Sequence, residues 1–188
     1  MKASVETPRI PPVEPPYDPD TAAMLAKWMP PGADIEPLKL FRTLAVHPDL
    51  MSRMRPLGSG ILGSTTVEPR DRELMILRTT ALNGAFYEWG VHATVFGPSV
   101  GITDEDAEAV AAGDLARFGN GDRTILRLAE ELHATSEVSD GLWIDLQTTH
   151  SLPQIVELVI TAAWYRLISY VINVAGVSDE PWALHRPC

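Results

Sequence analysis

The stretch PRDRELMILRTTALNGAFYEWGVHATVFGPSVG, residues 69–101, decides the fold of this chain. Pro69 suits the first turn of a helix, because its missing N–H would have no partner there. Apolar residues then recur at helical spacing over residues 70–82. Asn83-Gly84 tolerates left-handed backbone angles and ends this helix. An aromatic and small apolar stripe follows over residues 85–96, so the stretch predicts two antiparallel helices joined by a tight turn.

Two carboxylates and one imidazole in this stretch can move protons. Glu88 and His92 are four residues apart on the second helix, so they share a face beside the aromatic stripe. Glu73 lies one turn from Leu77 on the first helix, at the edge of an apolar face. Apolar surroundings raise the pKa of a carboxylate, and a nearby histidine can exchange protons with it. We therefore expect Glu73 and His92 to come within reach of each other across the turn.

Other interpretations of the same residues remain open. Glu88 and His92 can form an ordinary exposed i,i+4 pair, and Glu73 can be a first-turn acid favoured by the helix dipole. A Glu-x-x-x-His pair can also supply two metal ligands, but a zinc or iron site needs a third. Other candidate ligands show no spacing signal, namely His47, His133 and His150. We predict no metal site and no cofactor.

Three motifs follow one another along this part of the chain. A helix opens with R-x-R-E-L at residues 70–74, a second helix carries Tyr-Glu-Trp-x-x-His at residues 87–92, and a G-[IL]-[ST]-x-E turn follows at residues 101–105. Together they resemble the carboxymuconolactone decarboxylase and alkylhydroperoxidase D superfamily. Weaker similarity continues into the last long helix, so the resemblance covers about residues 40–176.

The resemblance implies an all-α bundle of about eight helices with an alkylhydroperoxidase D-like fold. It also implies a symmetric homo-oligomer, a dimer, trimer or hexamer. The peroxidase branch carries Cys-x-x-Cys just before the histidine, and those positions are Ala85 and Glu88 here. The only cysteine is Cys188, whereas dithiol peroxidase chemistry needs a nucleophilic and a resolving thiol. The chain therefore looks like the cysteine-free members.

The resemblance carries over the relay pair of Glu73 and His92. His92 is the expected proton donor, and Glu73 the acid that orients and tunes it. Glu88 can act as a second acid or base, and Tyr87 can donate a hydrogen bond to an oxyanion. Apolar substrate contacts are expected from Trp89, Phe86 and Phe96. A substrate carboxylate has four candidate partners, namely Arg70, Arg72, Arg78 and Arg166.

Composition limits the class of protein. The chain has 188 residues, enough for one domain with a sizeable core. Its net charge of −10 argues against nucleic acid and against anionic membrane surfaces as partners. A single cysteine allows no disulfide framework, so a cytoplasmic location is the default expectation.

We expect three regions. Residues 1–19 contain six prolines and form an extended arm, either disordered or wrapped around a neighbouring subunit. Residues 20–180 form a single helical domain, in which the Gly- and Ser-rich residues 57–66 are a loop at the rim of a pocket. Residues 181–188 are a tail. The last helix, expected over about residues 152–175, is apolar nearly all round, so part of it should pack against another subunit.

The leading functional hypothesis is a cofactor-free enzyme that decarboxylates, or transfers a proton on, a small carboxylated or lactone-like molecule. Loss of carbon dioxide leaves a dienolate, which the site must stabilise and then protonate. Alkylhydroperoxidase activity is a disfavoured alternative because the thiols are absent. A non-catalytic oligomeric binding protein is the third possibility, and it predicts that Glu73, Glu88 and His92 point apart or have no pocket beside them.

Overall fold

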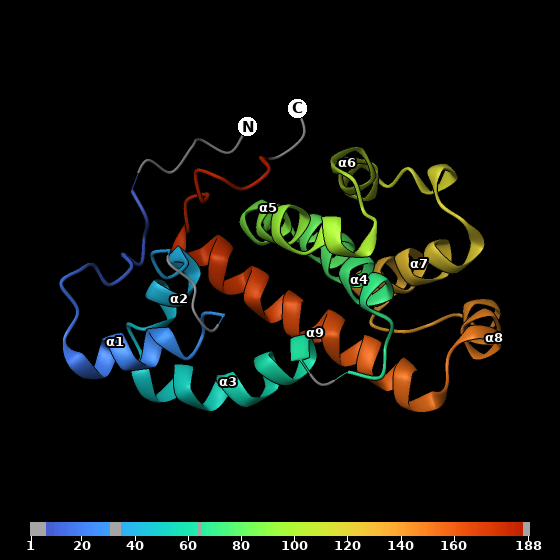
Figure 1. Cartoon of the computed structure of the whole chain (residues 1–188). Coiled ribbons are helices and arrows are strands. Elements are labelled where there is room, and N and C mark those ends of the chain that lie inside the picture. Colours follow the sequence, from blue (N-terminus) through green and yellow to red (C-terminus); the bar gives the residue numbers. More distant parts are fainter. Residues whose placement is uncertain (1–6, 31–34, 64, 186–188) are drawn as a thin grey trace.

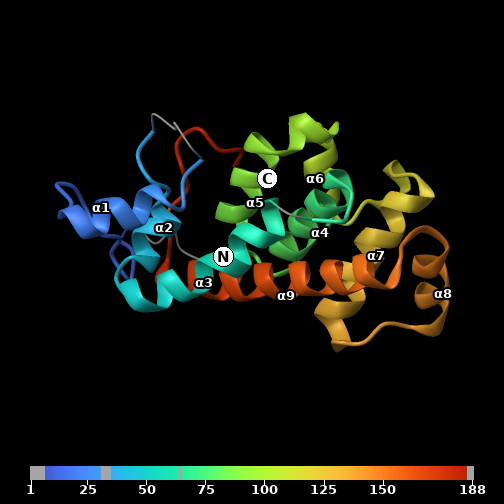
Figure 2. The same ribbon diagram turned by 60° about the horizontal axis from the view of Figure 1, so that its bottom comes forward.

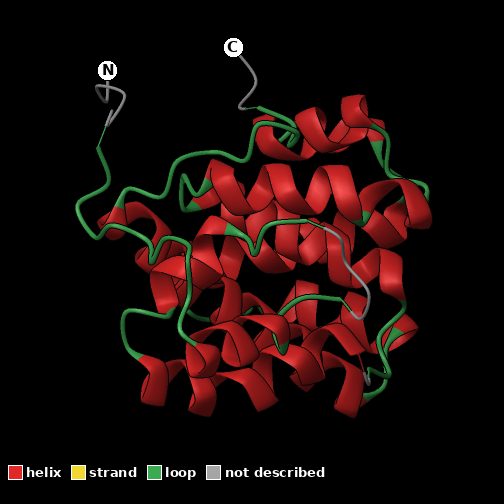
Figure 3. Cartoon of the chain, turned by 60° about the vertical axis from the view of Figure 1, so that its left-hand side comes forward, coloured by secondary structure: helices red, strands yellow, loops and turns green. Residues whose placement is uncertain are grey.

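The described part of the chain is entirely helical. The computed structural model describes residues 7–30, 35–63 and 65–185, and these hold helices and loops but no strand (Figure 3). In order, the elements are α1 (Pro19–Ala26), α2 (Lys39–Leu44), α3 (Pro48–Gly63), α4 (Pro69–Leu82), α5 (Phe86–Val95), η1 (Gly97–Val100), α6 (Asp104–Ala112), η2 (Leu115–Arg117), α7 (Asn120–Thr135), α8 (Asp140–Thr149) and α9 (Leu152–Ala175). The all-α prediction is confirmed, and the nine α-helices described are close to the expected eight.

Helix α4 is the centre of the bundle. It packs against α5, α6, α7 and α9, and every residue from Glu73 to Thr80 is buried (Figure 1). On one side lies an apolar cluster built with α6, α7, α8 and the first half of α9. On the other side, a second cluster joins α1, α2 and α3 to α5 and the second half of α9. The α4–α5 pair therefore lies between the two clusters.

The expected loop at residues 57–66 is wrong over most of its length, because α3 continues to Gly63. Pro56 and three glycines in this helix have poor helix propensity. Packing overrides them: a Cβ on Gly58 would lie 2.8 Å from the Trp164 ring of α9. The missing side chain thus lets the two helices approach closely, and Figure 2 shows α3 running beside α9.

Helix α9 is long and apolar enough to cross a membrane by length and composition alone. Half of its most apolar stretch is buried inside the structure. Figure 1 shows it crossing the bundle between α3 and the α4–α5 pair. Its role in the described structure is therefore that of a core helix.

Both ends of the described chain pack onto the bundle. The amides of Arg9 and Ile10 donate to the Ala175 carbonyl at 2.7 and 3.1 Å. The described part of the arm thus lies on its own chain, while residues 1–6 of the predicted arm fall outside the described residues. At the other end, the Leu184 amide donates to Thr94 Oγ1 of α5 at 2.8 Å.

Candidate active site

A buried carboxylate–imidazole pair joins α4 to α5. His92 Nδ1 lies 2.7 Å from Glu73 Oε2, and both side chains are almost completely buried. Arg72 Nε donates to the other oxygen, Glu73 Oε1, at 3.1 Å. The expected meeting of Glu73 and His92 is present in the structure. It arises because Asn83 and Gly84 turn the chain back directly, which sets the two helices side by side.

The pair is an ion pair at neutral pH. Burial lowers the pKa of His92, but Glu73 and Glu88 raise it more, to about 9. Burial raises the pKa of Glu73, but His92 and Arg72 together hold it below its ordinary value of 4.5. The raised carboxylate pKa that the apolar helix face suggested is therefore wrong in direction, because two cations contact Glu73. The imidazole of His92 therefore carries its proton at pH 7, and Glu73 is its counterion.

The free edge of the imidazole faces a cavity. His92 Nε2 lies 3.6 Å from Glu88 Oε1, and both residues line a cavity of about 520 Å³. Glu73 is not among the residues that line it. The two nitrogens of His92 thus have different surroundings: Nδ1 is held by Glu73 in the interior, and Nε2 is available beside the cavity.

The cavity wall comes from segments far apart in sequence. Helices α5 and α9 supply one part of the wall, the segment after α1 together with α2 and α3 supplies another, and the C-terminal tail contributes Trp182. The lining is predominantly apolar and aromatic, including Trp28, Phe41 and Trp164. Such a site buries an apolar ligand and strengthens the few electrostatic contacts inside it.

Tyr165 of α9 is a site residue that the motif did not reveal. It lines the cavity, and its ring meets the His92 ring edge-on, with the centroids 5.0 Å apart. Burial and the neighbouring Glu88 and Glu73 raise its pKa well above 10. Its hydroxyl therefore keeps its proton at neutral pH. Helix α9 lies far from residues 69–101 in the sequence, and no spacing pattern links the two segments. Only the fold could therefore place Tyr165 here.

The other aromatic residues predicted for the site divide between two places. Phe96 lines the cavity and stacks on His92 at 4.8 Å between ring centroids. Tyr87 lies elsewhere: its hydroxyl donates to Glu180 Oε1 at 2.8 Å and accepts from the Leu40 amide at 3.1 Å.

Trp89 and Phe86 also lie away from the cavity. Their rings meet edge-on at 5.9 Å, and both belong to the apolar cluster with α6, α7 and α8. Helix α5 is buried on several sides, so its aromatic residues contact different parts of the protein. The predicted aromatic stripe therefore does not line a single cavity. The predicted oxyanion role of Tyr87 and the substrate contacts of Trp89 and Phe86 do not fit this arrangement.

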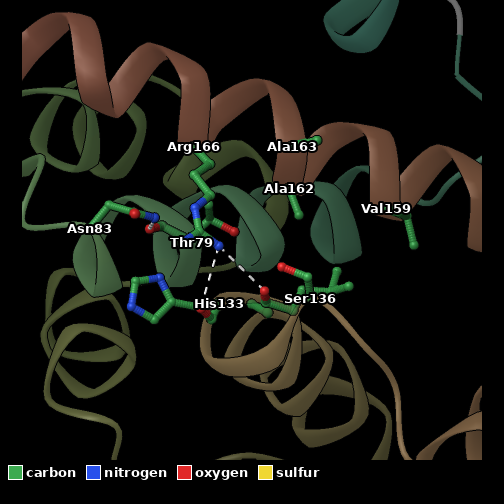
Figure 4. Close-up of a pocket in the computed structure, with 10 residues that line it drawn as sticks. Thr79, Asn83, His133, Ser136, Val159, Ala162, Ala163 and Arg166 are labelled. Carbon is green, nitrogen blue, oxygen red and sulfur yellow. Dashed lines mark hydrogen bonds between the residues drawn. The ribbon is translucent and has the colours of Figure 1, made fainter.

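None of the four candidate arginines lines the large cavity. Arg70 pairs with Asp122, Arg78 with Glu130, and Arg72 with Glu73. Arg166 lies in a separate cavity of about 230 Å³ between α4, α7 and α9 (Figure 4). Its guanidinium donates to the Leu132 and His133 carbonyls at the end of α7.

The fold and the site define the class of protein. It is an all-α bundle with a buried glutamate–histidine pair whose free imidazole edge faces an apolar cavity. Residues 48–131 match the model of the Carboxymuconolactone decarboxylase family. This match covers the helices that carry the three motifs, and it agrees with the resemblance to the carboxymuconolactone decarboxylase and alkylhydroperoxidase D superfamily that the motifs predicted.

Solved structures share the fold. A peroxidase-related protein from Silicibacter sp. TM1040 aligns with a TM-score of 0.78 over 94% of this chain and 95% of its own, at 13% identity. A second, from Ralstonia eutropha JMP134, is described as an alkylhydroperoxidase AhpD core. It aligns with a TM-score of 0.65 over 76% of each chain, at 20% identity. No curated protein matches the sequence.

Proposed function

We propose that this protein is an enzyme that protonates carbon by acid/base chemistry without a cofactor, on a carboxylated or lactone-like substrate. The observation that carries the proposal is the asymmetry of His92. Its Nδ1 is fixed by a buried carboxylate, while Nε2 lies beside an apolar cavity. A general acid needs this arrangement: a held orientation, a proton at working pH and access to the reacting atom.

Decarboxylation is the reaction that this donor suits best. The bond between carbon and the leaving carboxylate breaks, carbon dioxide departs, and the electron pair moves into an enolate. His92 Nε2 then gives its proton to carbon, and the imidazole is left neutral. Glu88, 3.6 Å from Nε2, can pass a replacement proton to it. Glu73 holds the imidazole ring in both its protonated and its neutral state, as the orienting acid does in triad chemistry.

Tyr165 is proposed as the oxyanion partner in place of Tyr87. Its pKa is raised by burial and by nearby carboxylates, so the phenol stays protonated and can donate. A donor placed beforehand in an apolar site stabilises a developing oxyanion more strongly than water does.

The test is turnover of β-oxo acids and carboxylated γ-lactones in D₂O, followed by NMR. Wild-type protein is expected to place one deuterium on the carbon that loses carbon dioxide. His92→Gln should lower the rate by roughly a hundredfold or more, the usual contribution of a general acid. Arg123→Gln, a change on the far surface, is the control and should have no effect. Full activity in a folded His92→Gln variant would exclude His92 as the donor.

Two alternatives make different predictions. A thiol peroxidase would consume peroxide with a thiol reductant, but the two thiol positions are Ala85 and Glu88. A binding protein without chemistry would show Glu73, Glu88 and His92 apart or without a cavity. Their convergence beside a cavity supports the enzyme proposal over the binding protein.

We also propose that the chain forms a homo-oligomer through α9. Apolar residues with more than 40% exposure follow one face of this helix at positions 156, 160, 167, 170 and 174. Their spacing of three, four and seven residues keeps them on one side of the helix, a pattern of the kind that pairs with another helix. An exposed apolar stripe of this length is typical of a protein–protein contact.

A further inference from the structure

The residues that close the cavity on the α1 side include a cluster of hydrogen-bond donors. Arg55 Nε of α3 donates to the carbonyl of Lys27 at 2.9 Å, which brings the guanidinium beside the end of α1. Lys27, Trp28 and Arg55 all line the cavity. Helices α1 and α3 lie side by side in Figures 1 and 2, so the three residues form one unit.

The charges of this donor cluster have no anionic partner in the part of the chain that the structure describes. Among the described residues, no ion pair involves Lys27 or Arg55. Among the described residues, the buried indole Nε1 of Trp28 has no hydrogen-bond partner. Buried donors are nearly always satisfied in native structures. Two cations with no ion pair among the described residues, at one end of a predominantly apolar cavity, point to an anionic group on the ligand.

The rest of the cavity is chemically different. Phe41, Trp164, Ile168 and Trp182 make its lining apolar. Its volume of about 520 Å³ falls within the roughly 300–1,000 Å³ of sites for drug-sized ligands. A one-ring polar lactone would leave much of this apolar surface without contacts. The cavity fits a larger ligand with an apolar body.

We propose that the cavity binds an apolar carboxylic acid whose carboxylate lies at the Lys27–Trp28–Arg55 cluster and whose apolar body extends toward His92. This inference rests on the proposed function for its reaction, because the reacting group would be a second function at the His92 end. The anchored carboxylate is not the group that leaves. Arg55, outside the motif, takes the role first considered for four other arginines.

The test is calorimetric binding of a matched pair of probes, 1-naphthylacetate and 1-naphthylacetamide, which differ only in the charged group. Wild-type protein should bind the acid at least tenfold more tightly than the amide, and succinate, which lacks the apolar body, more weakly than either. Arg55→Gln should weaken the acid about tenfold and leave the amide within twofold. Arg55→Lys should recover part of the loss. Equal affinity for acid and amide, or tight succinate binding, would overturn the proposal.

Two further variants separate the cavity from nonspecific binding. Ser59→Trp places a large ring on the cavity lining and should weaken both probes at least tenfold. Arg123→Gln removes one surface charge elsewhere and should change neither. Unchanged binding in Ser59→Trp, or equal losses in Arg123→Gln and Arg55→Gln, would place the probes outside the cavity.

The same experiment in His92→Gln distinguishes this inference from the proposed function. Binding of the acid should stay within threefold of wild type, because the anchor is at the other wall. If the acid binds as expected while no substrate is protonated, the proposed function fails alone. If deuterium transfer through His92 is observed but the acid shows no preference over its amide, the anchor at Arg55 fails alone.

Discussion

Replacing Glu73 by glutamine should remove a pH dependence of stability that His92 creates. The pKa of His92 is raised from 6.5 to about 9 in the folded protein, with burial opposing and the two glutamates causing the rise. One pKa unit corresponds to 1.36 kcal/mol, so the net effect of the fold on the protonation of His92 contributes about 3 kcal/mol to the free energy of unfolding. Since both side chains are buried, solvent screens this contribution little.

The sign follows from the direction of the shift. A raised folded-state pKa means that the stabilisation is complete below pH 6.5 and disappears as pH rises through 9. The lowered pKa of Glu73 adds an acid limit, because its contribution is lost as pH falls below 4.5. The wild-type protein should therefore exceed Glu73→Gln by about 3 kcal/mol near pH 6, and the two should converge above pH 9.

Urea unfolding between pH 5.5 and 9.5, followed by tryptophan fluorescence, measures this difference. An NMR titration of the imidazole should report a pKa well above 6.5 in wild type and a lower value in Glu73→Gln. Asp145→Asn, which removes an exposed carboxylate paired with Arg127, is the matched control and should follow wild type. A wild-type His92 pKa at or below 6.5, or parallel stability curves for wild type and Glu73→Gln, would refute the ion pair.

Three further predictions test other parts of the structure. Tyr165→Phe should lower turnover tenfold or more while leaving the NMR pKa of the histidine above 6.5; unchanged turnover would remove the phenol from the site. Ile160→Glu should dissociate the oligomer in sedimentation experiments, whereas Ile144→Glu, at a more exposed position on α8, should not; a wild-type monomer would contradict the α9 interface. Gly90→Ala should make the C-terminal tail sensitive to limited proteolysis, because the added Cβ would clash with the carbonyl of Leu184. Gly141→Ala, whose added Cβ meets no atom within 4 Å, is the control. A protected tail in Gly90→Ala would show that the backbone adjusts.

Much of the secondary structure can be predicted from local sequence, because helix caps and apolar periodicity act within one or two helical turns. The predicted helix ends near Leu82 and Ala175 agree with the structure. Left-handed residues or capping boxes mark most of these boundaries, and both act through backbone hydrogen bonds to near neighbours. Helix α3 differs, because its length depends on Trp164, a hundred residues away in sequence, packing over Gly58.

The relay pair could be predicted, but its electrostatics could not. Glu73 and His92 are linked by one tight turn, so their meeting follows from two helices and a loop. The pKa of Glu73 depends on Arg72, the neighbour in sequence, turning its side chain toward the carboxylate rather than toward solvent. That orientation is decided by packing, and it adds to the larger effect of His92, so that the pKa of Glu73 is lowered although burial raises it.

The sequence by itself determined the helix pair of residues 69–96 and the meeting of Glu73 with His92, because these depend on spacing within a single hairpin. Only the tertiary structure decided the shape of the cavity and its chemistry. Tyr165, Trp28 and Arg55 reach the cavity from α9, from the segment after α1 and from α3, and no periodicity connects these segments. Substrate contacts are non-local because a cavity exists only where several elements fail to fill the space between them.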